Sequence, residues 1–444
     1  MTREDPLSQR TLFGYAVATI PTQFAYILVL VMYMKYAVDD LGASATAVGT
    51  IFLVAKLWDA VSDPLVGNLS DRTNRRQGRR RPWLYASAPL LAISGVMAWA
   101  PPEGLEGAAL SAWITFAILF FYTAFTIFEV PHSALGAELS FDGQSRNRIF
   151  GYRQVLRTIG MFAGVTLGAY LVGTGRTGAA WIAWGLALFL VLLVVGGSSL
   201  LPPERAEFRG RGGGHPFRAV RDVFANEHAR LLLFVFFVEN IGAGGIGVLA
   251  PFVIEYVLDM GEAFVPALLA AYMVSALIAV PIWVRLGSRF EKRRLWLIAM
   301  IQGGVGFGLM LWVDQGDWLL MLVAAIIAGS AGSCGSTLGY VLKAEVIDYD
   351  EYRTGERKEG AYFATWSFTS KLANGIMVGL VGYSLDASGF VPNAAEQTEL
   401  AKSTMLFLMG GVPLIGYAIG SLAFSRFRLS EAEHARIRAA LDGR

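Results

Sequence analysis

Apolar segments of membrane-spanning length recur along the whole chain, and short polar stretches separate them. A helix needs about 20 apolar residues to cross the hydrocarbon core of a bilayer. The pattern therefore predicts an all-α integral membrane protein with twelve transmembrane helices. The predicted spans are residues 11–37, 46–69, 83–101, 109–134, 149–173, 178–200, 230–257, 264–285, 294–313, 318–342, 360–384 and 402–425.

Basic residues gather in alternate connections between these spans. Residues 71–82 carry six arginines and residues 202–230 carry six more, whereas connections such as 39–40 and 314–317 are acidic or neutral. Positively charged connections stay in the cytoplasm. The asymmetry predicts a multi-pass protein of the cell inner membrane with both termini in the cytoplasm, and it supports an even number of spans.

The chain divides at residues 202–229, a Pro-, Gly- and Arg-rich stretch that has the composition of a linker. A faint repeat supports two halves, because at an offset of 217 residues Pro64 falls on Pro281 and Arg72 on Arg289. Two parallel six-helix halves are the major facilitator arrangement. The predicted parts are an N-terminal half with the cation site (1–201), a cytoplasmic linker (202–229), a C-terminal half (230–427) and a cytoplasmic tail (428–444).

The composition excludes several classes of function. Charged residues make up 16% of the 444 residues, against about 25% in soluble proteins. A net charge of +2 gives no basis for nucleic-acid binding, and the single Cys334 excludes a disulfide framework or a multi-cysteine metal site. No nucleophile–base arrangement is evident. The expectation is a transporter that is not an enzyme, has no cofactor and functions as a monomer.

The stretch KLWDAVSDP places Asp59 and Asp63 four residues apart within a predicted span. Residues four apart share one helix face, and an acid within the membrane is by default a functional-site hypothesis. Glu129 and Thr126 lie on a predicted span nearby in the same half. If the two spans face each other, these oxygens would form a cage for a coupling cation, with Asp59, Asp63 and Glu129 as metal ligands for Na⁺.

Two lysines within spans are expected to balance this negative charge. Lys56 lies three residues before Asp59, and Lys371 is the deep charge of the late spans of the C-terminal half. A buried lysine needs an acidic partner or loses its proton. We therefore expect Lys371 to pair with the carboxylate cluster and to serve, with Lys56, in coupling or gating.

Structural alternatives remain for each of these residues. Asp59 can pair with Lys56, and Glu129 with Arg153, purely to hold helices together. Asp71, Arg72 and the arginine run behind them are assigned to gating as a cytoplasmic latch and topology signal. The aromatic residues Trp58, Tyr340 and Trp366 can stack on a substrate or serve as packing. The roles of Glu239 and His132 stay open from sequence, although His132 fits a satisfied interior histidine better than a proton carrier.

Four stretches, in order along the chain, are similar to motifs of the glycoside–pentoside–hexuronide:cation symporters of the major facilitator superfamily. They are KLWDAVSDPLVGNLSDRT with GRRRPW, TIFEVPHSALGAEL, NRIFGYRQ, and AEVIDYDEYRTGERKEGAYFATWSFTSK. The resemblance leaves no large part of the chain unaligned. It implies a secondary transporter that moves a sugar, glycoside or uronide together with Na⁺, Li⁺ or H⁺.

The resemblance also implies roles for individual residues. Asp59 and Asp63 would be cation ligands, Glu129 would serve both cation and sugar, Arg153 would contact sugar, and Lys371 would lie near both sites. Two positions depart from the family pattern: Gln23 stands where a sugar-binding acid is usual, and Ser133 replaces an aromatic residue that stacks on the sugar. The predicted substrate-binding residues are Gln23, Glu129, Arg153, Tyr340, Trp366 and Lys371.

Two other functions are weighed against this one. The stretch PHSALGAEL also resembles lysolipid carriers of the same superfamily branch, so the alternative is a cation-coupled carrier of an amphiphile. Such a carrier needs a long apolar groove, whereas a sugar site is polar and aromatic. A membrane receptor or enzyme that transports nothing is the third hypothesis. The sequence identifies neither the substrate nor the coupling ion.

Overall fold

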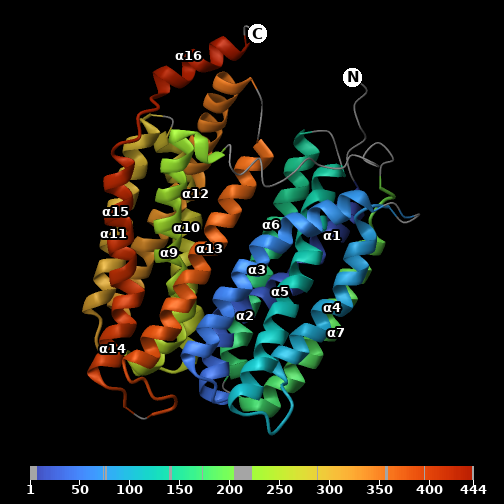
Figure 1. Ribbon diagram of the computed structural model, residues 1–444, viewed down its shortest axis with the longest axis vertical. Helices are drawn as coiled ribbons and strands as arrows, with labels where there is room; N and C mark the ends of the chain where they lie inside the picture. The colour runs from blue at the N-terminus through green and yellow to red at the C-terminus, as the bar shows by residue number, and fades with distance from the viewer. Residues whose placement is uncertain are drawn as a thin grey trace. The chain divides into compact units, whose positions relative to one another are not determined.

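The computed structural model describes residues 8–73, 75, 78–139, 143–172, 174–204, 223–287, 289–355, 359–394 and 396–442. Over these ranges the chain is helical apart from its connections and one isolated β-bridge between Arg75 and Gly78. It forms two compact units, Met1–Gly214 and His215–Arg444. Within each unit the long helices run roughly side by side (Figure 1).

The N-terminal unit begins with a span that is broken near its start. Its helices are α1 (Gln9–Val17), α2 (Thr19–Lys35), the π-helical η1 (Tyr36–Asp40), α3 (Ala45–Arg72), α4 (Arg81–Trp99), α5 (Gly107–Glu138), α6 (Gly143–Val172) and α7 (Gly175–Ser199). Ser44 caps α3, since its side chain accepts a hydrogen bond from the backbone of Ala47.

The C-terminal unit has the same number of long helical segments. They are α9 (Glu227–Tyr256), α10 (Val265–Gly287), α11 (Lys292–Leu309), α12 (Trp318–Thr354), α13 (Glu359–Ala387), and a last span made of α14 (Glu399–Leu406), η5 (Phe407–Gly411) and α15 (Val412–Phe424). Short turns η3 (Glu262–Phe264) and η4 (Met310–Trp312) join them. The final helix is α16 (Glu431–Asp442), in the segment that the sequence predicts as a tail.

Each of the twelve predicted spans falls on helical segments of the structure. Nine helices in the described part of the chain are long and apolar enough to cross a membrane. The segments α4, α6 and α13 are not among them. The protein is thus a multi-pass, all-helical membrane protein, and the number twelve stays a prediction.

The two units repeat one packing pattern. In the N-terminal unit α3 packs on α5, α4 packs on α5 and α7, and α2 packs on α6 and α7. In the C-terminal unit α10 packs on α12, α11 packs on α12 and on the last span, and α9 packs on α13 and on the last span. The correspondence is position for position, in agreement with the faint sequence repeat.

A stripe of glycines lets α6 approach α2 closely. A Cβ atom on Gly160 would lie 2.3 Å from the backbone oxygen of Ile20, and one on Gly164 would lie 2.8 Å from that of Phe24. Small residues four apart permit such close helix contacts in membranes. The contact matters for the site, because α6 carries Arg153 and Arg157 just before this stripe.

Residues 79–81 tie together the end of the N-terminal unit where α3, α5 and α7 finish. Arg79 donates to Glu138 at 2.6 Å, Arg80 donates to Ser70, and Arg81 donates to the backbone oxygen of Leu201. This network is a latch within the unit. The sequence predicted a latch of Asp71, Arg72 and the arginine run behind them, and Arg79, Arg80 and Arg81 belong to that run. Arg72 is exposed, and the side chain of Asp71 lies outside the described residues.

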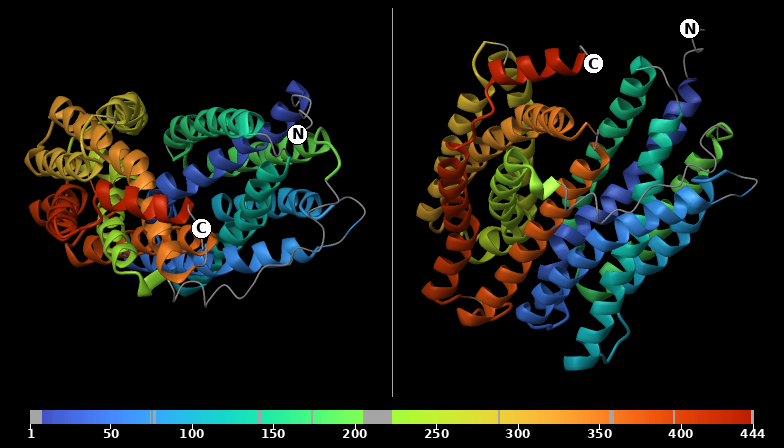
Figure 2. Two further views of the ribbon diagram at one scale, coloured as in Figure 1. Left: turned by 90° about the horizontal axis from the view of Figure 1, so that it is seen from above. Right: turned by 45° about the horizontal axis from the view of Figure 1, so that its top comes forward.

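The C-terminal tail is helical where the structure describes it. Helix α16 packs on α12 and lies across the end of its own unit (Figure 2). His434 on α16 is 3.0 Å from Asp348 on α12. The tail is therefore tied to its unit.

Candidate functional site

The two acids of α3 meet a hydroxyl of α5. The Thr126 hydroxyl oxygen lies 2.9 Å from Oδ1 of Asp59 and 3.2 Å from Oδ1 of Asp63. A hydroxyl carries a single hydrogen, so it satisfies only one of the two carboxylates at a time. Asp59 and Thr126 are buried. The arrangement brings two carboxylates close to the same hydroxyl, and two neighbouring acids form an environment that attracts a cation.

Neutral oxygens surround this acid pair. The Ser62 hydroxyl lies 3.4 Å from that of Thr126 and donates to the backbone oxygen of Asp59 at 3.1 Å. Pro64 lies within α3 and has no N–H to donate to the carbonyl of Ala60. Serine, threonine and carbonyl oxygens of this kind are ligands for a small hard cation.

Lys56 is directed at aromatic rings. Its ammonium donates to the Tyr26 hydroxyl at 3.2 Å and lies 4.1 Å from the ring centroid of Tyr122. The side chain is buried and interacts with Asp59 electrostatically, without an ion pair between them in the described contacts. The alternative of a direct Lys56–Asp59 pair is therefore not what the structure has. A cation–π contact holds the lysine instead.

Glu129 does not join the acid pair. Arg153 of α6 donates to its Oε1, and the Ser133 hydroxyl donates to the same oxygen at 3.3 Å. Among the described residues no three acidic, histidine or cysteine side chains form a group suited to a metal ion. The expected cage of Asp59, Asp63 and Glu129 stays a prediction: in this structure the guanidinium of Arg153 binds the glutamate, and Thr126 contacts Asp59 and Asp63.

The Glu129–Arg153 pair keeps two polar atoms unused. Glu129 Oε2 and Arg153 Nε are both buried and make no hydrogen bond within the described chain. A buried polar atom without a hydrogen-bond partner lowers the stability of the folded state by about 1–3 kcal/mol. The pair therefore retains one acceptor and one donor that a polar ligand could satisfy.

Gln23 extends this polar face. The Arg157 Nε donates to Gln23 Oε1 at 3.2 Å, and Gln23 is buried. Because α6 packs against α2, Gln23, the first-span position that departs from the family pattern, lies beside Arg157. Sequence reasoning did not include Arg157 in the site, although it lies one helical turn after Arg153.

His132 closes the break between α1 and α2. Its Nε2 lies 2.8 Å from the Tyr15 backbone oxygen, and the Tyr15 hydroxyl donates to the His132 backbone oxygen at 3.1 Å. The two rings stack with centroids 4.2 Å apart, and Phe128 covers the other side of the imidazole. With Nδ1 buried and unpartnered among the described groups, the imidazole fits a neutral donor that fixes the break.

The predicted residues of the C-terminal unit lie among other polar groups. Trp366 of α13 is buried, and the Lys343 ammonium lies 5.2 Å from its ring centroid and 4.0 Å from that of Phe236. Lys371 also lies on α13 and is half-buried, whereas the side chain of Tyr340 falls outside the described residues. Trp58, in the other unit, turns to donate to Thr123 at 2.8 Å.

The sequence placed Lys343 outside the spans, and it placed Glu239 within a span but left its role open. Lys343 was expected in the connection after residue 342, but α12 continues to Thr354 and buries it. Glu239 on α9 accepts from the Trp296 indole at 3.1 Å. The glycine after Thr354, whose backbone is left-handed, was the available signal that the helix runs on.

Comparison with known proteins agrees with this geometry. The family model described as MFS/sugar transport protein matches residues 14–431. A glucuronide carrier protein homolog of Escherichia coli is 24% identical, covering 93% of this chain and 92% of that protein. A sodium-dependent lysophosphatidylcholine symporter of mouse is 25% identical, covering 96% and 87%.

Solved structures agree on the fold. The nucleoside transporter NupG matches with a TM-score of 0.71 at 14% identity, covering 94% of this chain and 99% of that one. The repeated packing of the two units and the motifs on α3, α5 and α13 agree with the match to the family model. The chain therefore belongs to the glycoside–pentoside–hexuronide family of the major facilitator superfamily, the MFS/sugar transport proteins.

Proposed function

We propose that the protein is a secondary active transporter that carries a sugar, glycoside or uronide by cation-coupled symport. The observation that carries the polar substrate class is the Glu129–Arg153 pair, which keeps one unused acceptor and one unused donor. Sugar hydroxyls both donate and accept, so one hydroxyl can satisfy both atoms. The glucuronide carrier homolog supports the same class.

The coupling cation is proposed to bind at Asp59, Asp63 and Thr126. One Na⁺ or Li⁺ would be held by the two carboxylates and the hydroxyl, and a proton would be held between the carboxylates alone. Either ion relieves the repulsion between two acids that share one donor. Lys56, held by Tyr26 and Tyr122, limits the negative charge that remains.

Substrate and cation are proposed to bind cooperatively. Thr126 and Glu129 lie one turn apart on α5, so an ion that moves Thr126 also acts on the glutamate that meets the substrate. Such coupling is reciprocal: release of the ion weakens substrate binding by the same factor. A membrane potential supplies about 2.3 kcal/mol per charge per 100 mV. Alternating access of the two halves completes the cycle.

The remaining roles are proposals at residue level. Lys371 and Trp366 of the C-terminal unit, together with Tyr340, are proposed to contact the substrate, and Lys371 also to take part in coupling. The protein is proposed to be a monomer in the cell inner membrane with cytoplasmic termini. It catalyses no reaction in this proposal, and its ligands are the solute, the ion and the bilayer.

A cation-coupled amphiphile carrier is the second candidate. The lysophosphatidylcholine symporter of mouse is similar over most of its length. The polar atoms of Glu129 and Arg153 favour the sugar, because an acyl chain would leave both without a partner.

Thermal stability of the purified protein tests both parts of the proposal. A ligand that binds the folded state at 100 times its Kd raises the unfolding free energy by about 2.7 kcal/mol. Stability is measured across Na⁺, Li⁺, K⁺ and pH, and then with glycosides, uronides, pentoses and lysolipids. Asp59→Asn should lose the ion response, and Glu103→Gln, which changes an exposed acid, should keep it.

Two results would contradict the proposal. A protein stabilised by no cation at any pH lacks the coupling site. Stabilisation by lysolipids and by none of the sugars would select the amphiphile carrier instead.

A further inference from the structure

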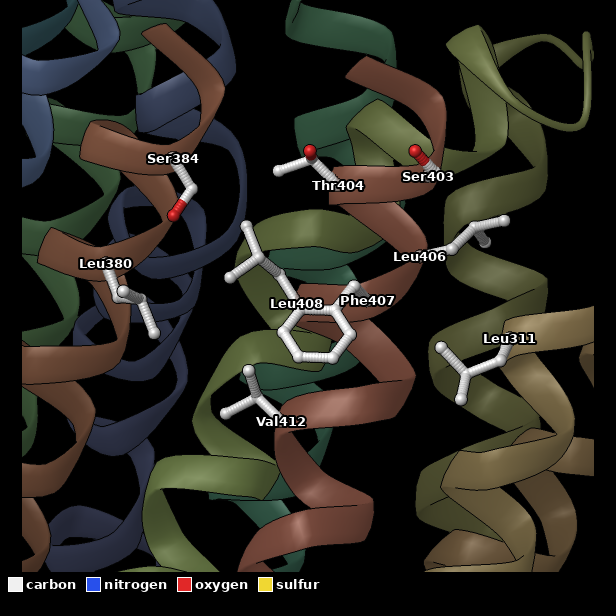
Figure 3. Close-up of a pocket in the computed structure, with 9 residues that line it drawn as sticks. All are labelled: Leu311, Leu380, Ser384, Ser403, Thr404, Leu406, Phe407, Leu408 and Val412. Atoms are coloured by element: carbon white, nitrogen blue, oxygen red, sulfur yellow. The ribbon is translucent and has the colours of Figure 1, made fainter. Parts of the chain in front are cut away.

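An open groove of about 500 Å³ lies on the last two spans of the C-terminal unit. Figure 3 shows its walls: α13 forms one and the α14–η5–α15 segment the other. The side chains used below are Leu380, Ser384, Ser403, Thr404, Phe407 and Val412. None of the residues proposed for cation or substrate binding lines it.

The groove is polar at one end and apolar at the other. Figure 3 shows the hydroxyls of Ser384, Ser403 and Thr404 together at one end, with Leu380 and Val412 further along. Ser384 lies near the end of α13 and Ser403 near the start of α14. Val412 is nine residues after Ser403, about 13 Å along the helix axis at a rise of 1.5 Å per residue. The apolar part therefore lies deeper in the span than the hydroxyls.

A π-helical turn shapes one wall. Phe407 begins η5, and its ring lies over Gly411 at the end of the turn, where a Cβ atom would come within 2.5 Å of the ring. The Phe407 side chain is 48% exposed. Single π-turns inside α-helices are often found at functional positions. Because Gly411 has no side chain, the Phe407 ring can lie against this turn, where it lines the groove.

The chemistry of the groove selects its occupant. The groove lies on helical segments of a multi-pass membrane protein, and the apolar side chains of its deep walls offer no hydrogen bond to an aqueous solute. The hydroxyls at the shallow end match the ester and glycerol region of a phospholipid, and the apolar part matches its chain. We propose that this groove holds an acyl chain of a bilayer phospholipid as a resident ligand, separate from the transported solute.

Filling the groove tests the proposal. Val412→Trp places an indole in its deep part, and Leu422→Trp is the matched control, because Leu422 lies on the same helix, is 71% exposed and is outside the groove. The full chain is purified from membranes in dodecyl maltoside and washed, and phospholipid per chain is measured by native mass spectrometry. Wild type and Leu422→Trp should retain a phospholipid, and Val412→Trp should retain roughly tenfold less.

A second variant covers a folding failure. If Val412→Trp does not yield a monodisperse protein, Leu380→Trp fills the groove from α13. Phospholipid retention by this variant is measured in the same way, with Leu422→Trp again as the control outside the groove.

Two outcomes would overturn the proposal. Undiminished phospholipid in both groove-filling variants means that the chain binds elsewhere. If palmitoyl lysophosphatidylcholine is taken up by wild type and this uptake is lost in Val412→Trp, the groove belongs to transport instead. The sugar symport proposal is distinguishable throughout, because cation and sugar stabilisation should be the same in wild type and every groove variant.

Discussion

Helix α3 of the N-terminal unit and helix α10 of the C-terminal unit occupy the same place in the repeated packing pattern, but only α3 carries acids. At the offset of 217 residues, Asp59 falls on Ala276 and Asp63 on Val280. Helix α10 packs on α12 just as α3 packs on α5. The fold therefore forms without carboxylates at these positions, and an acid retained there at an energetic cost serves something other than helix packing.

The C-terminal unit has polar groups of a different kind. Glu239 is bound by the indole of Trp296, and Lys343 lies over Phe236 and Trp366. These two charges have opposite signs and act on each other electrostatically, whereas in the N-terminal unit two like charges lie beside one hydroxyl. This difference supports the proposal that the N-terminal unit couples the ion, and each prediction below can break or sharpen it.

Exchange of one acid in each unit should give the largest contrast. Asp63→Asn should abolish concentrative uptake, because the cation loses one of its two charged ligands, while substrate exchange persists. A membrane potential of 100 mV acting on one coupled charge supports about fifty-fold accumulation of the solute, and this accumulation is what the variant should lose. Glu239→Gln should retain accumulation. Uptake of labelled solute into vesicles with an imposed gradient measures both, and accumulation by Asp63→Asn would remove the coupling role from the N-terminal unit.

Substitution of the guanidinium should weaken substrate binding without changing the ion response. Arg153→Lys loses the planar fork that meets Glu129 and the substrate, so the apparent substrate Kd should rise roughly 10- to 100-fold. Arg79→Lys makes the same chemical change at a residue paired with Glu138 and should leave the Kd unchanged. Titrations monitored by thermal shift give both values. A loss of the Na⁺ response in Arg153→Lys would mean that cation and substrate share one site.

The break in the first span should depend on one donor. His132→Gln keeps an N–H that reaches the Tyr15 carbonyl, whereas His132→Asn is too short to reach it. We expect Asn to lower the unfolding free energy by about 1–3 kcal/mol and Gln to lower it less. Denaturant unfolding compares them. Equal losses for the two variants would show that ring stacking, and not the hydrogen bond, holds the break.

Two indoles of the C-terminal unit should differ by a smaller amount. Trp296→Phe removes the donor to Glu239, while Trp366→Phe removes an N–H that has no partner among the described residues. The two changes delete similar volume, so their difference, about 1 kcal/mol or more, isolates the hydrogen bond. If Trp366→Phe instead weakens sugar binding, the unused N–H belongs to the substrate site.

The sequence was sufficient for features that depend on local pattern. Apolar segments located the helices, and spacing of four put Asp59 and Asp63 on one face, where Thr126 meets them. Features that depend on contacts between distant residues were not predictable. Whether Glu129 turns to the acids or to Arg153 depends on how closely α6 approaches α2, and the burial of Lys343 depends on rings from two other helices.

The carboxylate of Glu204 has a consequence for the construction of split proteins. It accepts from the backbone N–H groups of Arg79, Arg80 and Arg81, at 2.6, 2.8 and 2.7 Å, and so caps the first turn of α4 from a residue more than a hundred positions later. Gly78, with φ of +110°, makes room for it. If the chain is divided after Glu204 and the two fragments are co-expressed, the first fragment contains both α4 and the carboxylate that caps it. If the chain is divided a few residues earlier, Glu204 falls on the other fragment and α4 loses its cap.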